Sequence, residues 1–172
     1  FVYQGNIVDV WERLVFRHIQ IELGSDQTSC HNIDHLGYCP VECTFEEAKV
    51  LLDDDKEAFD HAVKRSLRRH VDAINVMCSR GMYFWDYGNA FLFEAAKAGA
   101  DIMDPHQPSG FKYPSYVEDI MGPMCFDYGF GPFRWICTSG DNADLKTTDV
   151  IAGEAIRDML RTCPQEIRSQ WE

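Results

Sequence analysis

Apolar residues recur at helical spacing in some parts of the chain and alternate with polar residues in others. Asn6 precedes a segment in which Val10 and Leu14 share one helical face, so a helix is predicted with Asn6 as its N-cap. Residues 18–23 then alternate polar and apolar side chains, which predicts a β-strand that ends at Gly24. A helix followed by a strand indicates an α/β fold.

Capping signals mark two further helices. Thr44 and Glu47 have the spacing of a capping box, which predicts a short helix that ends near Leu52. The aspartates at 53–55 offer the next N-cap, and residues 56–80 carry the apolar face of a long helix. The basic side chains of this helix are predicted to face solvent rather than to bind an anion: Lys64, Arg65, Arg68 and Arg69.

Shorter elements are predicted in the rest of the chain. In order they are a strand over 82–85, a turn over 86–89, a helix over 90–98, a helix over 116–121 capped by Ser115, a strand over 133–137 and a helix over 149–160. Gly122 and Pro123 interrupt this pattern. We therefore expect a domain boundary there, with one domain in residues 1–121 and the start of another in 122–172.

Charge, hydropathy and cysteine content limit the partners and the compartment that we expect for this protein. The 172 residues carry a formal net charge of -12, which argues against nucleic acid or an anionic membrane as partner. No apolar run is long enough to cross a bilayer. Seven irregularly spaced cysteines without a secretory signal fit reduced thiols in a cytoplasmic protein. Because the chain opens on Phe1 and stops in a helix-compatible pattern, we expect a segment of a larger enzyme.

Two polar segments follow predicted strands, where α/β sheets bind ligands. Residues 26–31 offer short polar side chains and backbone N–H groups, and an ordinary turn that satisfies its own backbone is the alternative. Residues 85–89 combine Gly88, which allows close backbone approach, with the ring and hydroxyl of Tyr87. A packed structural turn is equally compatible with this second segment.

Two further groups of side chains have the chemistry of a binding site. Four zinc-type side chains occur, but their spacing differs from that of zinc knuckles and no metal site is predicted: His31, His35, Cys39 and Cys43. Arg134 lies between Phe133 and Trp135, and a guanidinium in such surroundings needs an anionic or polar partner. A ligand carboxylate and an internal ion pair both remain open for Arg134.

Six strings in order resemble the urocanate hydratase (urocanase) family: 4–6 (QGN), 25–31 (SDQTSCH), 37–38 (GY), 84–90 (FWDYGNA), 113–117 (YPSYV) and 129–135 (GFGPFRW). The resemblance implies an α/β fold in which residues 1–121 are the rear part of a Rossmann-like NAD-binding domain. Residues 122–172 would then begin the C-terminal catalytic core region. The Gly-rich phosphate turn of the family is expected before Phe1, and its active-site cysteine beyond Glu172, so none of the seven cysteines here is assigned to catalysis.

The resemblance also implies a function. The family adds water to urocanate to give 4-imidazolone-5-propanoate in histidine degradation, with tightly bound NAD+ as electrophile, and the parent protein is expected to be a cytoplasmic homodimer. Arg134 would bind the substrate carboxylate. The NAD+ contacts would be Asn6, Ile7, Gln27, Thr28, Ser29, Cys30, His31, Tyr38, Cys39 and Tyr87.

Other interpretations stay open at this point. The segment could be a noncatalytic NAD- or zinc-binding structural module derived from the same fold, or part of a conventional NAD-dependent dehydrogenase. By itself the segment is expected to be inactive, because half of the nucleotide site and the later catalytic residues would be missing.

Overall fold

The computed structural model describes residues 2–27, 29–88, 90–128, 131, 136–165, 168 and 169. Its contacts divide the chain into two units, Phe1–Gly122 and Pro123–Glu172.

The first unit is built around a pair of parallel strands, β1 (Leu23–Asp26) and β2 (Tyr83–Asp86). In this register Leu23 lies opposite Tyr83, and Asp26 lies opposite Asp86. Parallel strands need a long crossover. The chain supplies it through a short 3₁₀ turn, η1 (Ile33–His35), and two helices, α2 (Phe45–Asp54) and α3 (Lys56–Ser79).

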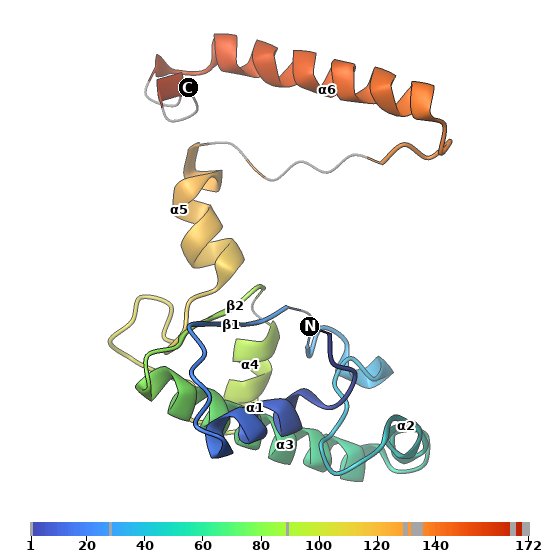
Figure 1. Ribbon diagram of the computed structural model, residues 1–172, viewed down its shortest axis with the longest axis vertical. Coiled ribbons are helices and arrows are strands. Elements are labelled where there is room, and N and C mark those ends of the chain that lie inside the picture. Colours follow the sequence, from blue (N-terminus) through green and yellow to red (C-terminus); the bar gives the residue numbers. More distant parts are fainter. Residues whose placement is uncertain are drawn as a thin grey trace. The chain divides into compact units, whose positions relative to one another are not determined.

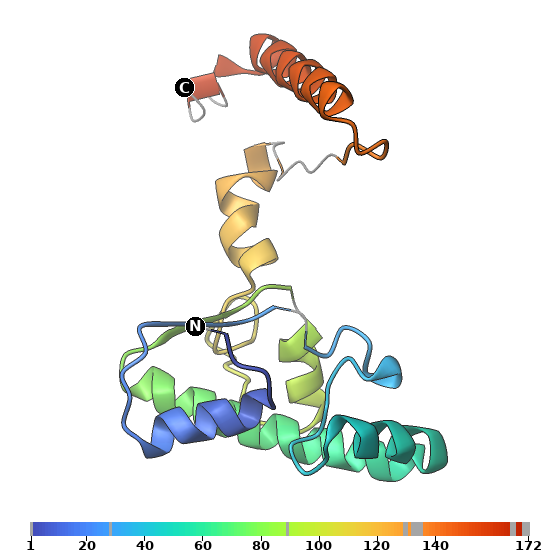
Figure 2. The ribbon, with the colours of Figure 1, turned by 45° about the vertical axis from the view of Figure 1, so that its right-hand side comes forward.

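Helices cover one face of this sheet. Figures 1 and 2 both show α1 (Ile7–Phe16), α3 and α4 (Ala90–Lys97) on the same side of the two strands. Gly24 and Phe84 are buried toward the helices, whereas Leu23 and Tyr83 are exposed on the other face. The strands therefore cover one side of a core that lies mainly between α1, α3 and α4. The largest buried side chains of this core are Phe59, Leu67, Ile74, Met77, Phe84, Phe91, Leu92 and Ile102.

The predicted helix starts are confirmed by their capping bonds. The side chain of Asn6 accepts a hydrogen bond from the backbone N–H of Val8. Thr44 and Glu47 form the reciprocal capping box of α2. Asp55 caps α3 by accepting from the N–H of Ala58. Such caps satisfy N–H groups that have no partner inside the helix, so each is set by a few neighbouring residues.

The first strand begins five residues later than predicted. Residues 18–22 leave α1 in a turn instead, with His18 at a positive φ of 53° and the Gln20 amide donating to the carbonyl of Arg80. The strand begins at Leu23 and includes Gly24, which was expected to end it. A Cβ at Gly24 would lie 2.8 Å from both Met82 and the Trp11 ring, so the missing side chain lets the strand pack on the helices.

The segment over 116–121 is helical as predicted, with Ser115 accepting from the N–H of Glu118. Its form is a π-helical turn, η2 (Tyr116–Met121), and α5 (Gly122–Met124) and η3 (Phe126–Tyr128) follow it. Of the strand predicted over 133–137, residues 133–135 lie outside the described residues. Ile136 and Cys137 are not in a strand.

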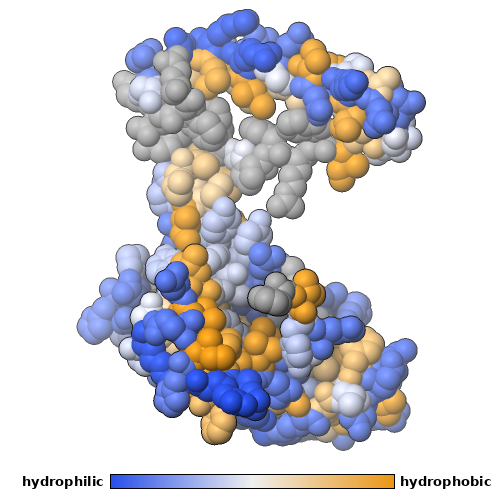
Figure 3. Space-filling model, in the orientation of Figure 1, coloured by the Kyte–Doolittle hydropathy of each residue, from blue (hydrophilic) through white to orange (hydrophobic). Residues whose placement is uncertain are grey.

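The second unit is dominated by α6 (Asn142–Thr162). The predicted start at Asp149 was wrong, because Asp141 caps the helix by accepting from the N–H of Ala143 at 2.6 Å. The hydroxyls of Thr147 and Thr148 donate to carbonyls one turn earlier, which lets these residues lie inside the helix. Apolar side chains remain exposed along α6 among hydrophilic ones (Figure 3). No helix in the described part of the chain is long and apolar enough to span a membrane.

Candidate functional site

Two buried carboxyl groups lie at the ends of the parallel strands. Asp26 is 6% exposed and Asp86 is 2% exposed, and they are register partners. An oxygen of Asp26 accepts a hydrogen bond from the N–H of Ser29 at 3.1 Å. An oxygen of Asp86 accepts from the N–H of Leu92 at 3.2 Å, in the first turn of α4. Each carboxyl group therefore shapes the segment that follows its strand.

The electrostatic setting of this pair is unusual. Burial raises the pKa of Asp26 to about 6, against the lowering effect of the Ser29 hydrogen bonds, and the nearby Asp86 raises it further. Burial also raises the pKa of Asp86, while backbone N–H groups of Leu92, Gly88 and Phe91 lower it. At neutral pH the sheet edge thus carries negative charge that is poorly solvated.

The segment after β1 folds into a compact loop against the turn after β2. Cys30 is buried, has a φ of 68°, and donates its N–H to the carbonyl of Gly37 at 3.1 Å. Gly37 in turn donates to the carbonyl of Asn32 at 2.7 Å. A Cβ added to Gly88 would lie 3.4 Å from the His31 ring nitrogen. The two polar segments selected from the sequence therefore meet at the carboxyl end of the sheet.

Asn6 connects the start of α1 to the same loop. Its side-chain amide donates to the carbonyl of Cys39 at 2.9 Å, while its oxygen caps the helix. A pocket of about 520 Å³ lies at this junction, and Asn6, Cys39 and Thr44 are among its lining residues. Asn6 and Cys39 are thus neighbours although 33 positions separate them in the sequence.

Two predicted contact residues turn their side chains away from solvent. Tyr38 is 4% exposed, and its hydroxyl lies 3.3 Å from Nδ1 of His70 in α3. Burial raises the pKa of the Tyr38 hydroxyl well above its usual range, so it stays protonated. Burial likewise raises the pKa of the Cys30 thiol, which makes it a packing group and not a nucleophile. Any ligand contact of these two residues would be made by backbone atoms.

The remaining predicted contacts are more accessible. Gln27 and His31 are exposed, Ser29 is half-buried, and Ile7 is 40% exposed at the start of α1. The ring of Tyr87 stacks on Tyr116, with centroids 5.1 Å apart and an interplanar angle of 14°. The other two predicted site residues, Thr28 and Arg134, lie outside the described residues.

The zinc alternative concerns His31, His35, Cys39 and Cys43. Across the described ranges, no group of three or more His, Cys, Asp or Glu side chains is arranged to hold a metal ion. The Cys39 thiol lies 3.8 Å from the carbonyl oxygens of Pro40 and Cys43.

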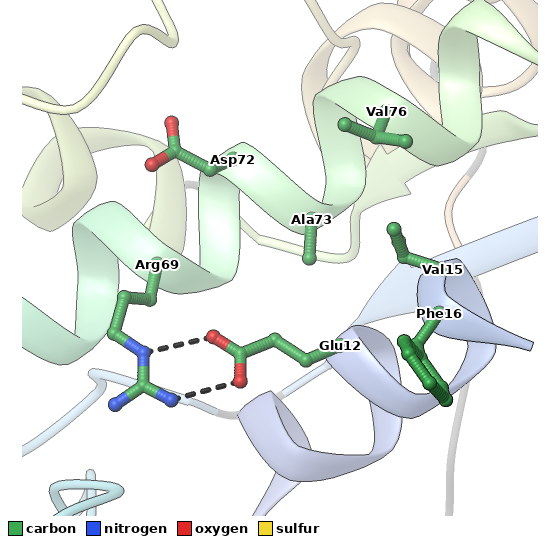
Figure 4. Close-up of a pocket in the computed structure, with 7 residues that line it drawn as sticks. All are labelled: Glu12, Val15, Phe16, Arg69, Asp72, Ala73 and Val76. Atoms are coloured by element: carbon green, nitrogen blue, oxygen red, sulfur yellow. Dashed lines mark hydrogen bonds and ion pairs between the residues drawn. The ribbon is translucent and has the colours of Figure 1, made fainter.

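The basic residues of α3 are partly exposed, and each also has a bonded partner, which for Arg68 is the carbonyl of Ala98, so the prediction that they face solvent was incomplete. Arg69 makes a two-bond ion pair with Glu12 of α1, at 2.8 Å for each bond, and Arg65 pairs with Glu42. Figure 4 shows the Glu12–Arg69 pair beside a hollow between α1 and α3. This hollow contains none of the predicted contact residues, and its arginine is already neutralised.

The carboxyl pair was missed as a unit by sequence reasoning. In the sequence, Asp26 belongs to a polar segment and Asp86 to a turn pattern, and neither pattern indicates that the two carboxyl groups meet. Both aspartates are the last residues of short strands, but nothing in the local sequence indicates that these two strands pair. Only the parallel register brings the two together.

Comparisons with known proteins cover both units. A family model described as the urocanase Rossmann-like domain matches residues 1–120, and one described as the urocanase C-terminal domain matches residues 123–170. The chain is 54% identical to a probable urocanate hydratase of Dictyostelium discoideum over 94% of its length. It is 53% identical over 87% to urocanate hydratase of Mus musculus, and 48% identical over 92% to that of Homo sapiens.

These alignments cover 24%, 23% and 24% of the relatives, so the chain spans about a quarter of their length. The helices packed on one face of a parallel strand pair agree with an α/β, Rossmann-like fold. The chain belongs to the urocanase family.

Proposed function

We propose that the full-length polypeptide carrying this chain is a urocanate hydratase, a lyase that adds water to urocanate to give 4-imidazolone-5-propanoate. The observation that carries the proposal is the 54% identity, over 94% of the chain, to a relative named as a probable urocanate hydratase. The two family domains in consecutive order support it. The segment alone, at about a quarter of its relatives' length, is expected to be inactive.

We further propose that the loops at the carboxyl end of β1 and β2 contribute to an NAD+ site. When bound, NAD+ supplies an electrophilic nicotinamide that activates the substrate. Nucleotides bind α/β sheets at this edge. The exposed side chains of Gln27 and His31 lie there, and Gly88 keeps the second turn open beside His31. The residues present therefore fit a polar, ring-containing ligand.

The charge of the site favours one end of the dinucleotide. Asp26 and Asp86 place poorly solvated negative charge at the sheet edge, which disfavours phosphate groups. A cationic nicotinamide and the hydroxyls of its ribose suit this environment better. We therefore assign these loops to the nicotinamide riboside end, and the pyrophosphate to parts of the polypeptide outside this chain.

The contacts proposed for NAD+ divide into two kinds. Gln27, Thr28, Ser29, His31 and Tyr87 belong to the segments that follow the strands. The second kind belongs to the junction of α1 with the loop, where the Asn6 side chain already bonds to protein atoms. There, as at the buried Cys30, we expect the contacts to be made by backbone atoms, and the residues concerned are Asn6, Ile7, Tyr38 and Cys39.

Arg134 is proposed to bind the carboxylate of urocanate. The planar guanidinium forms two parallel hydrogen bonds with a carboxylate, which would fix the orientation of the substrate. This assignment rests on the resemblance, since Arg134 lies outside the described residues.

The wider context is also proposed. We assign residues 1–121 to the rear of the NAD-binding domain and 122–172 to the start of the catalytic core region, with the active-site cysteine outside this chain. All seven cysteines are unpaired, which supports a reducing compartment and hence a cytoplasmic location. A homodimer rests on the resemblance alone.

The decisive test is the loss of urocanate's ultraviolet absorbance on addition of the full-length polypeptide. Steady loss without formation of NADH supports the hydratase. Formation of NADH in step with substrate loss would indicate a dehydrogenase instead. No loss by a polypeptide with bound NAD would indicate a relative with a different substrate.

A further inference from the structure

His70 occupies an unusual place in the core. It lies in the middle of α3, is 1% exposed, and packs its ring on Phe91 with centroids 4.8 Å apart. Its Nε2 has no hydrogen-bond partner among the described atoms. A buried imidazole with an unpaired nitrogen costs stability compared with an apolar side chain. Packing alone therefore does not explain a histidine at this position.

The other ring nitrogen of His70 has a specific partner. Nδ1 lies 3.3 Å from the hydroxyl oxygen of Tyr38. Burial lowers the pKa of His70 to about 3, so the ring is neutral at physiological pH. A neutral imidazole has one acceptor nitrogen, and the protonated Tyr38 hydroxyl can donate to it. This bond joins the core side of α3 to residue 38 of the loop after β1.

His70 contacts both segments that follow the strands. Through Tyr38 it contacts the loop after β1, and through Phe91 it contacts the first turn of α4 after β2. Phe91 is also held from the sheet side, because its backbone N–H bonds to Asp86. One buried ring thus lies beneath both proposed cofactor segments.

We infer that His70 is a positioning residue, which holds the loop after β1 and the start of α4 in the relative position that NAD+ binding requires. The inference rests on the proposed NAD+ site and adds to it a residue that does not touch the cofactor. Without the Tyr38 bond, the loop would spend less time in its binding-competent position. The apparent affinity for NAD+ then falls in proportion to that population.

The matched variants are His70→Asn and His70→Leu in the full-length polypeptide. Asn and Leu have nearly the same shape, but only Asn keeps a polar partner close to the position of Nδ1. Leu suits the apolar surroundings better but leaves the Tyr38 hydroxyl unpaired, so a purely structural role predicts that the two variants differ in thermal stability and not in NAD+ affinity. A positioning role through Tyr38 predicts weaker NAD+ binding for His70→Leu than for His70→Asn.

The measurement is the NAD+ dissociation constant of the apo form by calorimetry, with thermal unfolding of each variant as the control for folding. We expect His70→Leu to raise the dissociation constant about three- to tenfold, the range expected for one hydrogen bond, and His70→Asn to restore most of the loss. Equal affinities for the two variants, or wild-type affinity for His70→Leu, would overturn the inference.

Tyr38→Phe provides a second, milder variant that keeps the ring and removes the hydroxyl. It should weaken NAD+ binding as much as His70→Leu does, and the double variant should be no weaker than either single variant. Additive losses would show that the two residues act separately and would overturn the inference. If the wild-type polypeptide itself does not bind NAD+, the proposed function fails before any variant is compared.

Discussion

Replacing Asp26 with Asn should stabilise the first unit at neutral pH and change little at acidic pH. Asp26 is 6% exposed at the end of β1, and burial raises its pKa to about 6 from an ordinary value of 3.8. Asn has the same shape, and its side-chain oxygen can still accept the N–H of Ser29. The substitution therefore removes the charge while it preserves the loop.

The sign follows from proton binding. Between pH 4 and 6 the folded state holds a proton on Asp26 that the unfolded chain has already released. The free energy of unfolding must then fall as pH rises through this window. A shift of about two pKa units corresponds to about 3 kcal/mol at about 1.36 kcal/mol per unit. Asp26→Asn should recover about 2–3 kcal/mol at pH 7.5 and close to none at pH 4.

The assay is urea unfolding of the 172-residue chain, followed by far-ultraviolet circular dichroism at several pH values between 4 and 8. Only the difference between variant and wild type is interpreted, so groups that titrate alike in both cancel. Asp53→Asn, which neutralises an exposed carboxylate in α2, serves as the matched control. A difference that stays constant with pH, or a variant less stable than wild type at pH 7.5, would refute the reasoning.

Three further predictions concern caps, packing and substrate. Asn6→Ala removes the cap of α1 and the bond to the Cys39 carbonyl, so unfolding in urea should need about 1–2 kcal/mol less; an unchanged midpoint would show that water replaces both bonds. Gly24→Val places atoms against Met82 and Trp11, so the thermal midpoint should drop by an amount equivalent to about 1–3 kcal/mol, and an equal or higher midpoint would contradict the close approach. Arg134→Lys in the full-length polypeptide should raise KM for urocanate, as measured by absorbance loss, because the two-bond contact is lost; unchanged kinetics would remove Arg134 from the substrate site.

The predicted site was only partly readable in the sequence. The sequence predicts polar segments at the ends of two strands, and the structure places His31 of one segment beside Gly88 of the other. The direction of the side chains was not accessible. Tyr38 and Cys30 are buried in a loop that closes through the bond from Cys30 to Gly37. The same loop contacts α3 through the bond between Tyr38 and His70, which joins residues 32 positions apart.

What the sequence determined by itself is local. Helix starts are marked by capping residues because a cap involves only residues two or three positions apart, as at Asn6, Thr44, Asp55 and Ser115. The long apolar face of 56–80 likewise predicted α3 almost to its last residue. These features need no knowledge of the rest of the fold.

The tertiary structure decided the features that depend on distant partners. Gly24 pairs with Phe84 in the sheet, and its lack of a side chain lets it pack against Trp11 and Met82. The carboxyl groups of Asp26 and Asp86 form a pair because a parallel register aligns strand ends that are 60 residues apart. Burial in that register raises the pKa values of both carboxyl groups, and the local sequence does not show that these side chains are buried.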